Sequence, residues 1–344
     1  MKAAVFTGVG TFEIQERPIP EIGPEDALVK VAACGVCGTD VHIYHGDPAS
    51  APVKPPVVLG HEFSGIVEKI GSRVTRIHPG DPVTVDPNIY CGQCEYCRAG
   101  RKQLCENLFA IGVNRDGGFA EYCAVPESQC FQLDKGTDLL YGAMTEPLAC
   151  CIHGMDRLPL RSGETVCIIG GGAIGLMMLQ LARLKGAAAV IVSEPAAGRR
   201  AVAEQLGADF TINPMEEKVG EKVRDLTRSQ GADIVIECAG NPTAVRQSLE
   251  AAGPGASVLL FSVPMPGSEL GLSLEAVYQK ELTILGSRIN PDTHSRAAAL
   301  INRGLIRLDP IITHRYPIEK MDEAVRMQMS QESLKVVVGN EICR

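Results

Sequence analysis

Tryptophan is absent from this chain of 344 residues, and aromatic residues make up only 4% of it, so aliphatic side chains must fill the core. No apolar run approaches the ~20 residues that a membrane-spanning helix requires. A basic block is also missing, and the formal net charge is −8, which argues against nucleic acid as a partner. The opening residues lack the apolar core of a signal peptide, so we expect a cytoplasmic protein.

Cysteine, in contrast, is abundant, with 13 residues in the chain. In a reducing cytosol thiols stay free or bind metal, so disulfides are not expected. Cys91, Cys94, Cys97 and Cys105 follow the pattern C-x2-C-x2-C-x7-C in a loop with little apolar character. This spacing is typical of a closed structural zinc site, and it predicts a zinc lobe over residues 88–106. We interpret the thiols outside the predicted metal sites as small buried hydrophobic residues: Cys34, Cys123, Cys130, Cys150, Cys151, Cys167, Cys238 and Cys343.

The length of the chain suits two domains, and the local pattern changes between them. Residues 1–150 contain short strand-like runs separated by turn clusters such as His78-Pro-Gly-Asp81, which predicts a β-rich domain. Farther along, strands alternate with helices, as in an α/β fold with a parallel sheet. We therefore predict an α/β domain over 151–286 and a final stretch, 287–344, that packs back on the first domain.

A nucleotide-binding fingerprint opens the second domain. Gly170, Gly172 and Gly175 form G-x-G-x-x-G between a compact apolar strand and a helical pattern. The first glycine permits a tight turn, the second lets the backbone approach a pyrophosphate, and the third allows helix and strand to pack closely. The N–H groups at Ala173 and Ile174 would then hold the phosphates. A plain turn is the alternative, but the strand–turn–helix context favours a dinucleotide site in a doubly wound sheet of the Rossmann type.

Glu194 ends the next strand, about 20 residues after the glycines. A carboxylate in this position accepts hydrogen bonds from the 2′-hydroxyl of the adenosine ribose and repels a 2′-phosphate. We therefore expect NAD rather than NADP. Arg199 and Arg200 lie near enough to alter that preference, and we include Arg199 among the candidate cofactor-binding residues.

Cys37, His61 and Glu62 form a second candidate metal site. A catalytic zinc keeps three protein ligands and one open position. None of these residues is specific alone, because a cysteine beside a glycine turn is usually structural and a lone histidine usually belongs to the core or the surface. Cys34-x2-Cys37 also fits a redox pair, but it precedes a β-rich segment and does not lie in a thioredoxin-like βαβ unit.

The motif Gly60-His-Glu-x2-Gly65-x5-Gly71-x2-Val74, the four-cysteine lobe and the nucleotide-binding unit together resemble the zinc-dependent medium-chain alcohol dehydrogenases over essentially the whole chain. Within that family, Cys34-Gly-Val-Cys-Gly-Thr-Asp-Val-His42 and Thr145-Glu-Pro-Leu148 resemble the threonine and polyol (sorbitol-type) branch. The resemblance implies an α/β protein with a GroES-like catalytic domain, a Rossmann domain and two zinc ions per chain, one catalytic and one structural.

The resemblance also implies roles for individual residues. Cys37 and His61 would hold the catalytic zinc, and Glu62 would be a direct or intermittent ligand. Glu146 would bind the zinc directly or through water, with a plain surface carboxylate as the alternative. Asp40 would orient His61, although a helix cap is an alternative role for it.

The implied reaction is hydride transfer from an alcohol to the nicotinamide, with zinc lowering the pKa of the substrate hydroxyl. In such a reaction Thr39 and His42 would pass the released proton outward. Considered alone, Thr39 could merely cap a helix and His42 could be a solvated histidine.

The sequence does not select one alcohol. Candidate residues of the pocket wall are Ile43, Tyr44 and the stretch Gly286–Asn290, in which a buried Arg288 could bind a carboxylate, phosphate or sulfonate. Arg288 could equally contact the cofactor or solvent. The candidate substrates are polyols, vicinal diols, L-threonine-like compounds and anionic hydroxy compounds.

Two alternative functions stay open: a primary-alcohol or formaldehyde-type zinc dehydrogenase, and a zinc- and nucleotide-binding protein without turnover. The complete ligand set and proton relay argue against the second alternative, because a binding module needs neither. From the branch we expect a homo-oligomer, either a tetramer or a dimer.

Overall fold

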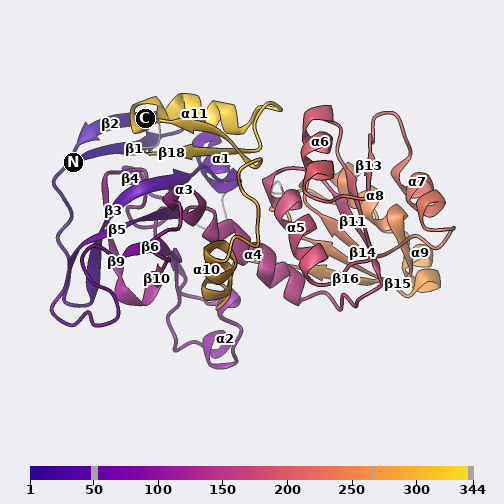
Figure 1. Cartoon of the computed structure of the whole chain (residues 1–344), viewed down its shortest axis with the longest axis horizontal. Coiled ribbons are helices and arrows are strands. Elements are labelled where there is room, and N and C mark those ends of the chain that lie inside the picture. Colours follow the sequence, from indigo (N-terminus) through magenta and orange to yellow (C-terminus); the bar gives the residue numbers. More distant parts are fainter. Residues whose placement is uncertain (48–52, 265–266, 340–344) are drawn as a thin grey trace. The chain divides into compact units, whose positions relative to one another are not determined.

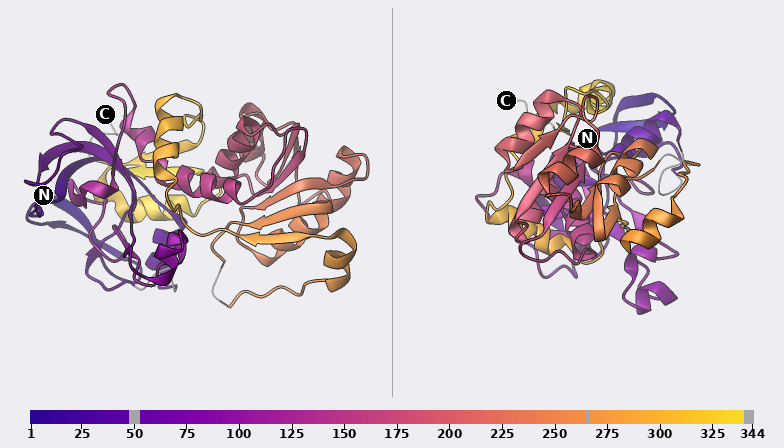
Figure 2. Two further views of the ribbon diagram at one scale, coloured as in Figure 1. Left: turned by 90° about the horizontal axis from the view of Figure 1, so that it is seen from below. Right: turned by 90° about the vertical axis from the view of Figure 1, so that its right-hand side faces the viewer.

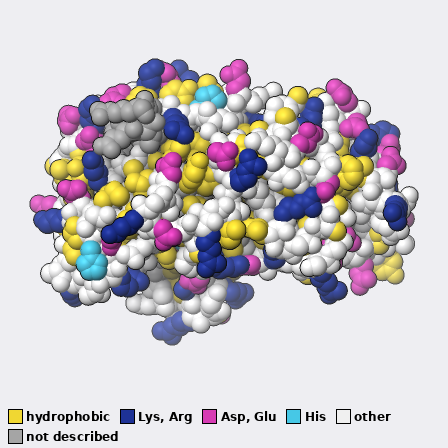
Figure 3. All heavy atoms as spheres, viewed as in Figure 1, with side chains coloured by type: hydrophobic (Ala, Val, Ile, Leu, Met, Phe, Trp, Pro, Cys, Tyr) yellow, Lys and Arg dark blue, Asp and Glu magenta, His cyan; other side chains and the backbone are white. Residues whose placement is uncertain are grey.

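The chain forms two compact units, one made of Met1–Ala149 with Asn290–Arg344 and the other of Cys150–Ile289. The structure is a computed structural model that describes residues 1–47, 53–264 and 267–339 (Figure 1). Among these residues, no helix is both long and apolar enough to cross a bilayer. On the face drawn in Figure 3, acidic and basic side chains are interspersed, in keeping with the lack of a basic block in the sequence.

The first unit is built on two β-sheets. A small sheet has the order β2-β1-β4, and a larger one has the order β10-β6-β5-β3-β18-β17 with β9 paired to β3. The strands of the small sheet are β1 (Lys2–Gly8), β2 (Thr11–Glu16) and β4 (Val57–Val58). Those of the larger sheet are β3 (Asp26–Gly35), β5 (Glu62–Ile70), β6 (Pro82–Val85), β9 (Tyr122–Pro126), β10 (Cys130–Gln132), β17 (Ile312–Tyr316) and β18 (Lys335–Val338).

The last strand of the chain completes the larger sheet. Strand β18 pairs antiparallel with β3, with Val337 opposite Gly35 and Val338 opposite Cys34, and parallel with β17. In Figure 1 and in the left view of Figure 2, yellow C-terminal strands lie among indigo and violet N-terminal strands. The pairing of β18 with β3 brings the C-terminal segment to the part of the first unit where the candidate metal ligands lie.

The helices of the first unit are short and lie in the connections. They are α1 (Gly38–His45), α2 (Glu95–Arg98), α3 (Leu139–Gly142), α10 (His294–Asn302) and α11 (Met321–Gln328), and α4 (Thr145–Asp156) begins in this unit. The core is aliphatic apart from a few rings such as Phe63 and Phe119, as the composition predicts.

The second unit holds the parallel sheet that the sequence predicts. Its order is β13-β12-β11-β14-β15-β16, with every neighbouring pair parallel. The strands are β11 (Thr165–Ile169), β12 (Ala189–Ser193), β13 (Phe210–Ile212), β14 (Ala232–Glu237), β15 (Ala252–Leu260) and β16 (Thr283–Gly286). The helices are α5 (Ala173–Leu184), α6 (Ala197–Gln205), α7 (Val219–Leu226), α8 (Pro242–Ala251) and α9 (Leu274–Lys280).

The strand order reverses at β11, because β12 lies on one side of it and β14 on the other. In doubly wound sheets this switch point, at the carboxyl ends of the strands, is where dinucleotides bind. Strand β11 is buried from Val166 to Ile169, as expected for a central parallel strand covered on both faces.

The described cysteines are free, in agreement with the expectation of no disulfides. Of the thiols interpreted as buried, Cys150 and Cys238 are only half-buried. Cys343 lies outside the described residues.

Candidate active site and structural metal centre

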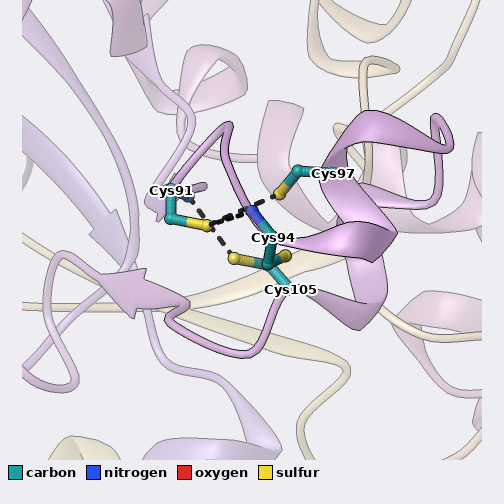
Figure 4. A group of neighbouring side chains, drawn as sticks. All are labelled: Cys91, Cys94, Cys97 and Cys105. Carbon is teal, nitrogen blue, oxygen red and sulfur yellow. Dashed lines mark hydrogen bonds between the residues drawn. The ribbon is translucent and has the colours of Figure 1, made fainter.

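The four cysteines of the lobe converge on one point. Their sulfur atoms all lie within 4.8 Å of one another, and Cys91 Sγ is 3.9 Å from Cys97 Sγ (Figure 4). Sulfur atoms at the corners of a tetrahedron, each about 2.3 Å from zinc, are about 3.8 Å apart. Backbone N–H groups donate to this cluster, from Cys94 to Cys91 Sγ and from Cys91 to Cys105 Sγ, each over 3.4 Å. The four residues therefore fit a tetrahedral zinc.

Backbone hydrogen bonds favour the thiolate form that zinc requires at Cys91 and Cys94, whereas burial raises the pKa of the Cys97 thiol. The backbone N–H groups of Cys94 and Gln93 lower the pKa of Cys91 to about 6. The lobe has little apolar burial of its own, because Cys97 and Cys105 are the only buried residues between 91 and 105. The ion would therefore supply the cohesion that a hydrophobic core supplies elsewhere.

A second cluster, in the first unit, brings together Cys37, His61 and Glu62. One ligand atom from each lies within 4.8 Å of the other two. Strands β3 and β5 pair with Gly35 opposite Glu62, so Cys37, just beyond β3, comes beside His61, just before β5. Gly60 has a φ of +93°, and a Cβ there would lie 2.7 Å from the Phe119 ring. The glycine before His61 is thus required by the turn that presents the imidazole.

Asp40 supports two of the three members of the cluster, Cys37 and His61. It is fully buried, its Oδ2 accepts a hydrogen bond from the backbone N–H of Cys37 at 2.9 Å, and its Oδ1 lies 3.7 Å from His61 Nδ1. Asp40 therefore caps α1 and faces the imidazole at the same time. Burial lowers the pKa of His61, but Asp40, Cys37 and Glu146 together raise it well above its ordinary value. The imidazole lies in a strongly anionic environment.

The cluster has the properties of a cation site. His61 Nδ1 and Asp40 Oδ1 are both buried and lie 3.7 Å apart, which leaves the other ring nitrogen of His61 as the metal donor. A thiol, an imidazole and a carboxylate are the donors that zinc takes in catalytic sites. The residues present therefore fit zinc.

Lys335 is a member of this site that the sequence analysis missed. Its ammonium forms an ion pair with Glu62, and only 4% of Lys335 and 1% of Glu62 are exposed. The pair closes over Gly35, where any Cβ would clash with both side chains. A lysine in the otherwise apolar run Leu334–Val338 is a signal that could have identified it, because unpaired charge is almost never buried.

Glu146 lies in the first turn of α4 and is 7% exposed. Its carboxylate is near enough to raise the pKa of His61, yet it is not part of the three-atom cluster of Cys37, His61 and Glu62. Thr39 and His42 lie three residues apart on α1 and therefore share a face of that helix. His42 Nδ1 is 3.4 Å from a carboxylate oxygen of Asp47.

Three candidate pocket residues do not have the expected surroundings. Tyr44 is 5% exposed and its ring stacks on Phe12 with centroids 5.8 Å apart, so it belongs to the core of the first unit and not to a pocket wall. Ile43 is buried in the same core. Arg288 is exposed, so the buried guanidinium considered from the sequence is not present.

The glycine-rich loop of the second unit has the geometry of a phosphate cradle. Gly170 has a φ of +107°, and a Cβ on Gly175 would clash with the Gly170 carbonyl oxygen. Beside Gly172, the N-cap of α5, a Cβ would meet nothing within 4 Å. The space beside this N-cap adjoins the first turn of the helix that begins at Ala173 and Ile174, and N–H groups at a helix N-terminus are a general site for anions.

Glu194 is 4% exposed and supports this loop directly. Its Oε2 accepts a hydrogen bond from Gly171 N at 2.9 Å, and its Oε1 accepts one from Ala196 N at 2.9 Å. Arg200 donates to the carbonyl oxygens of Glu194 and Pro195. Arg199 lies beside it in the first turn of α6. The predicted acidic residue is therefore in contact with the predicted glycine loop.

Comparison with known proteins bears on both units. Residues 23–135 match the model of the alcohol dehydrogenase GroES-like domain, and residues 173–303 match that of the zinc-binding dehydrogenases. The chain is 42% identical over 329 residues to an L-threonine 3-dehydrogenase of Symbiobacterium thermophilum, covering 94% of this chain and 93% of that one. It is 36% identical to a sorbitol dehydrogenase of Halalkalibacterium halodurans, covering 98% and 99%.

Solved structures agree with these matches. A zinc-binding dehydrogenase of Sinorhizobium meliloti bound to NADP superposes with a TM-score of 0.94 at 45% identity, covering 98% of each chain. Galactitol-1-phosphate dehydrogenase of Escherichia coli superposes with a TM-score of 0.89 at 32% identity, covering 98% of this chain and 100% of that one.

Proposed function

We propose that this chain, which belongs to the zinc-dependent medium-chain alcohol dehydrogenases in their threonine and polyol branch, transfers hydride from a secondary alcohol to NAD. The observation that carries the proposal is the cluster of Cys37, His61 and Glu62 in the GroES-like unit of a chain whose other unit presents an open glycine loop. A thiolate, an imidazole and a carboxylate fix a catalytic zinc and leave it one open position.

The residues of the first unit have distinct roles in the proposed reaction. Zinc held by this cluster supplies Lewis-acid polarisation of the substrate hydroxyl, which lowers its pKa toward neutrality. The Cys37 thiolate and the His61 imidazole bind the metal, and Asp40 holds the orientation of both. Thr39 and His42 conduct the released proton away, and a carboxylate oxygen of Asp47 lies 3.4 Å from His42 Nδ1.

Glu62 and Glu146, the two carboxylates near the proposed metal, have different surroundings. Glu62 is neutralised by Lys335, so it reaches the metal only against the attraction of that ammonium. Glu146 enters from the start of a different element, α4. We propose Glu146 as a ligand, bound directly or through water, and Glu62 as a direct or intermittent one.

The preference for NAD rests on the charge of Glu194. Its carboxylate lies against the glycine loop, where it would repel a 2′-phosphate. The relative from Sinorhizobium meliloti was solved with NADP bound, so the preference of this chain for NAD needs a direct test. We expect Glu194→Gln to lower the ratio of kcat/KM for NAD to that for NADP about tenfold. Glu194→Ala is the comparison, because it also removes the acceptor for Gly171 N. An unchanged ratio in both variants would remove Glu194 from cofactor selection.

The substrate is a secondary alcohol with a neighbouring polar group. The relatives named above include enzymes of L-threonine, sorbitol and galactitol-1-phosphate, which share that chemistry. The test is NADH formation against L-threonine, sorbitol, 2,3-butanediol and a sugar-alcohol phosphate, with ethanol and a formaldehyde–thiol adduct as primary-alcohol controls. Faster turnover of either control would favour the primary-alcohol alternative, and no turnover of any compound would favour a binding protein.

We further propose a cytoplasmic homo-oligomer, a tetramer or a dimer. The free thiols of the described residues suit a reducing compartment. Strand β16 lies at the edge of its sheet, and Leu274 and Tyr278 on the adjoining α9 are 79% and 82% exposed. Exposed edges and apolar residues of this kind favour association. Light scattering would measure the mass in solution, and a monomer would contradict this part of the proposal.

A further inference from the structure

A buried polar cluster in the first unit includes none of the candidate metal ligands, and its centre is Asn290. Asn290 is fully buried, and its amide group bridges two other side chains. Asn290 Oδ1 accepts a hydrogen bond from Asn88 Nδ2 at 2.6 Å, and Asn290 Nδ2 donates to Asp86 Oδ1 at 3.3 Å. Asp86 Oδ1 also accepts from the backbone N–H of Asn88 at 3.0 Å. The segment that re-enters the first unit is thereby fixed to the loop between β6 and β7 (Asn88–Ile89).

The same segment also holds α4. Thr293, three residues after Asn290, is 5% exposed, and its Oγ1 donates a hydrogen bond to the carbonyl oxygen of Ala149 at 2.8 Å. Ala149 is fully buried and lies three residues after Glu146, within the first turns of α4. A hydroxyl that binds this carbonyl restrains the part of the helix that presents the Glu146 carboxylate.

The backbone between these two anchors is constrained. Ile289 and Asp292 both adopt positive φ values, 46° and 57°, which non-glycine residues rarely take. Such conformations persist only where the surroundings impose them. An ion pair of 2.7 Å between Lys102 and Asp292 adds a further link, to the four-cysteine lobe. The short segment 289–293 is therefore a rigid clamp with one end on the β6–β7 loop and the other on α4.

We propose that Thr293 and Asn290 are positioning residues for Glu146. The clamp of residues 289–293 then determines where the Glu146 carboxylate meets the catalytic metal. This inference rests on the proposed role of Glu146 as a ligand. Thr293 acts on the helix directly, through the Ala149 carbonyl, and Asn290 acts through the segment that carries Thr293. Neither residue touches a reacting atom. Their effect is on how firmly the metal is held and on the rate of the chemical step.

The experiment compares zinc release and kinetics in the zinc-loaded enzyme. Thr293→Val keeps the shape of the side chain and removes the hydroxyl, and Thr293→Ser restores it. We expect Thr293→Val to release the catalytic zinc to a chelator about tenfold faster and to lower kcat by a similar factor, as is usual when a supporting residue of a metal site is lost. The KM for NAD should stay within twofold of the wild-type value, and the lobe zinc should be retained. In Thr293→Ser, which keeps a hydroxyl, the rate of zinc release and kcat should be those of the wild type.

Two further variants separate the possible outcomes. Asn302→Ala is the matched control, because Asn302 also fixes α10 by hydrogen bonds, from Thr137 Oγ1 and Asp134 N, but lies at the opposite end of α10 from Thr293. Glu146→Gln tests the ligand role itself. If Glu146→Gln accelerates zinc release and Thr293→Val does not, the positioning role is wrong and the ligand role stands.

The remaining outcomes are also decisive. If Glu146→Gln leaves zinc release and kcat unchanged, the proposed ligand role fails. Equal acceleration by Asn302→Ala would show general loosening and would overturn the inference. If Thr293→Val does not fold, Asn290→Ala is measured in its place, with the same expected and opposing results.

Discussion

The buried ion pair between Lys335 and Glu62 yields a prediction with a definite magnitude. In Lys335→Met the ammonium is lost while the Glu62 carboxylate stays where it is, with 1% of that residue exposed. Burial lowers the pKa of Lys335, but the Glu62 carboxylate and the Cys37 thiol raise it above its ordinary value, so the lysine is charged at neutral pH. The variant therefore contains an uncompensated buried charge.

Removing one partner of a buried pair costs about 3–5 kcal/mol of unfolding free energy, because the remaining charge is neither solvated nor paired. Taking the lower figure, the melting temperature should fall by about 6–12 °C in a unit of this size. The double variant Lys335→Met with Glu62→Gln removes both charges, and most of the loss should then be recovered.

The assay is a double-mutant cycle by thermal unfolding of protein from which the catalytic zinc has been removed, so that no metal pairs with Glu62, and retention of the lobe zinc is checked before each scan. The matched control is Lys2→Met, since Lys2 forms a 2.6 Å ion pair with Glu319 in which both side chains are 45% exposed. An exposed pair of this kind contributes little to stability, because solvent screens its charges. If Lys335→Met costs no more than Lys2→Met, or the double variant is no more stable than Lys335→Met alone, the reasoning from burial is refuted.

The remaining predictions concern the two metal sites and the dependence of stability on pH. Cys37→Ser should abolish NADH formation and lower the zinc content from about two to about one per chain, with little change in melting temperature. Cys94→Ser should instead lose the structural zinc and melt at a lower temperature. Equal effects of the two substitutions would contradict the division into a catalytic and a structural site. Burial lowers the pKa of His294 to about 3, and its Nε2 lies 3.3 Å from Thr84 Oγ1. Because the folded pKa lies below the unfolded value of about 6.5, stability is complete above pH 6.5 and falls as the pH drops toward 3, by about 3 kcal/mol at pH 4. The free energy of unfolding in urea, measured from pH 4 to pH 8, should therefore fall less with acid in His294→Phe than in the wild type. If the free energies of the two proteins differ by the same amount at every pH, His294 does not titrate this way.

The local motifs were correctly interpreted from the sequence because their geometry is local. The cysteines at 91–105 are so close in sequence that almost any compact loop brings them together. The glycines at 170–175 need only a strand before them and a helix after them, which hydrophobic periodicity predicts. The parallel sheet of the second unit follows from the same alternation of strands and helices.

Residues joined by distant pairings were missed or misplaced. Lys335 reaches Glu62 because β18 pairs with β3, and no spacing rule predicts which strand fills that place in the sheet. The same holds for Asn290 with Asp86. Tyr44 was expected in a pocket wall, since α1 carries site residues, but its ring turns to the opposite face of the helix and stacks on Phe12.

The sequence alone determined the chemistry that is available: four thiols in one loop, a thiol, an imidazole and carboxylates in glycine-bounded turns, and a phosphate-binding loop before a helix. Those features depend on residue type and on spacings of a few residues, which the backbone satisfies locally. The tertiary structure decided how the ligands are charged, supported and held apart. That outcome depends on which distant segments share a buried, low-dielectric space, where an ammonium on the last strand or an amide at position 290 acts over a few ångströms.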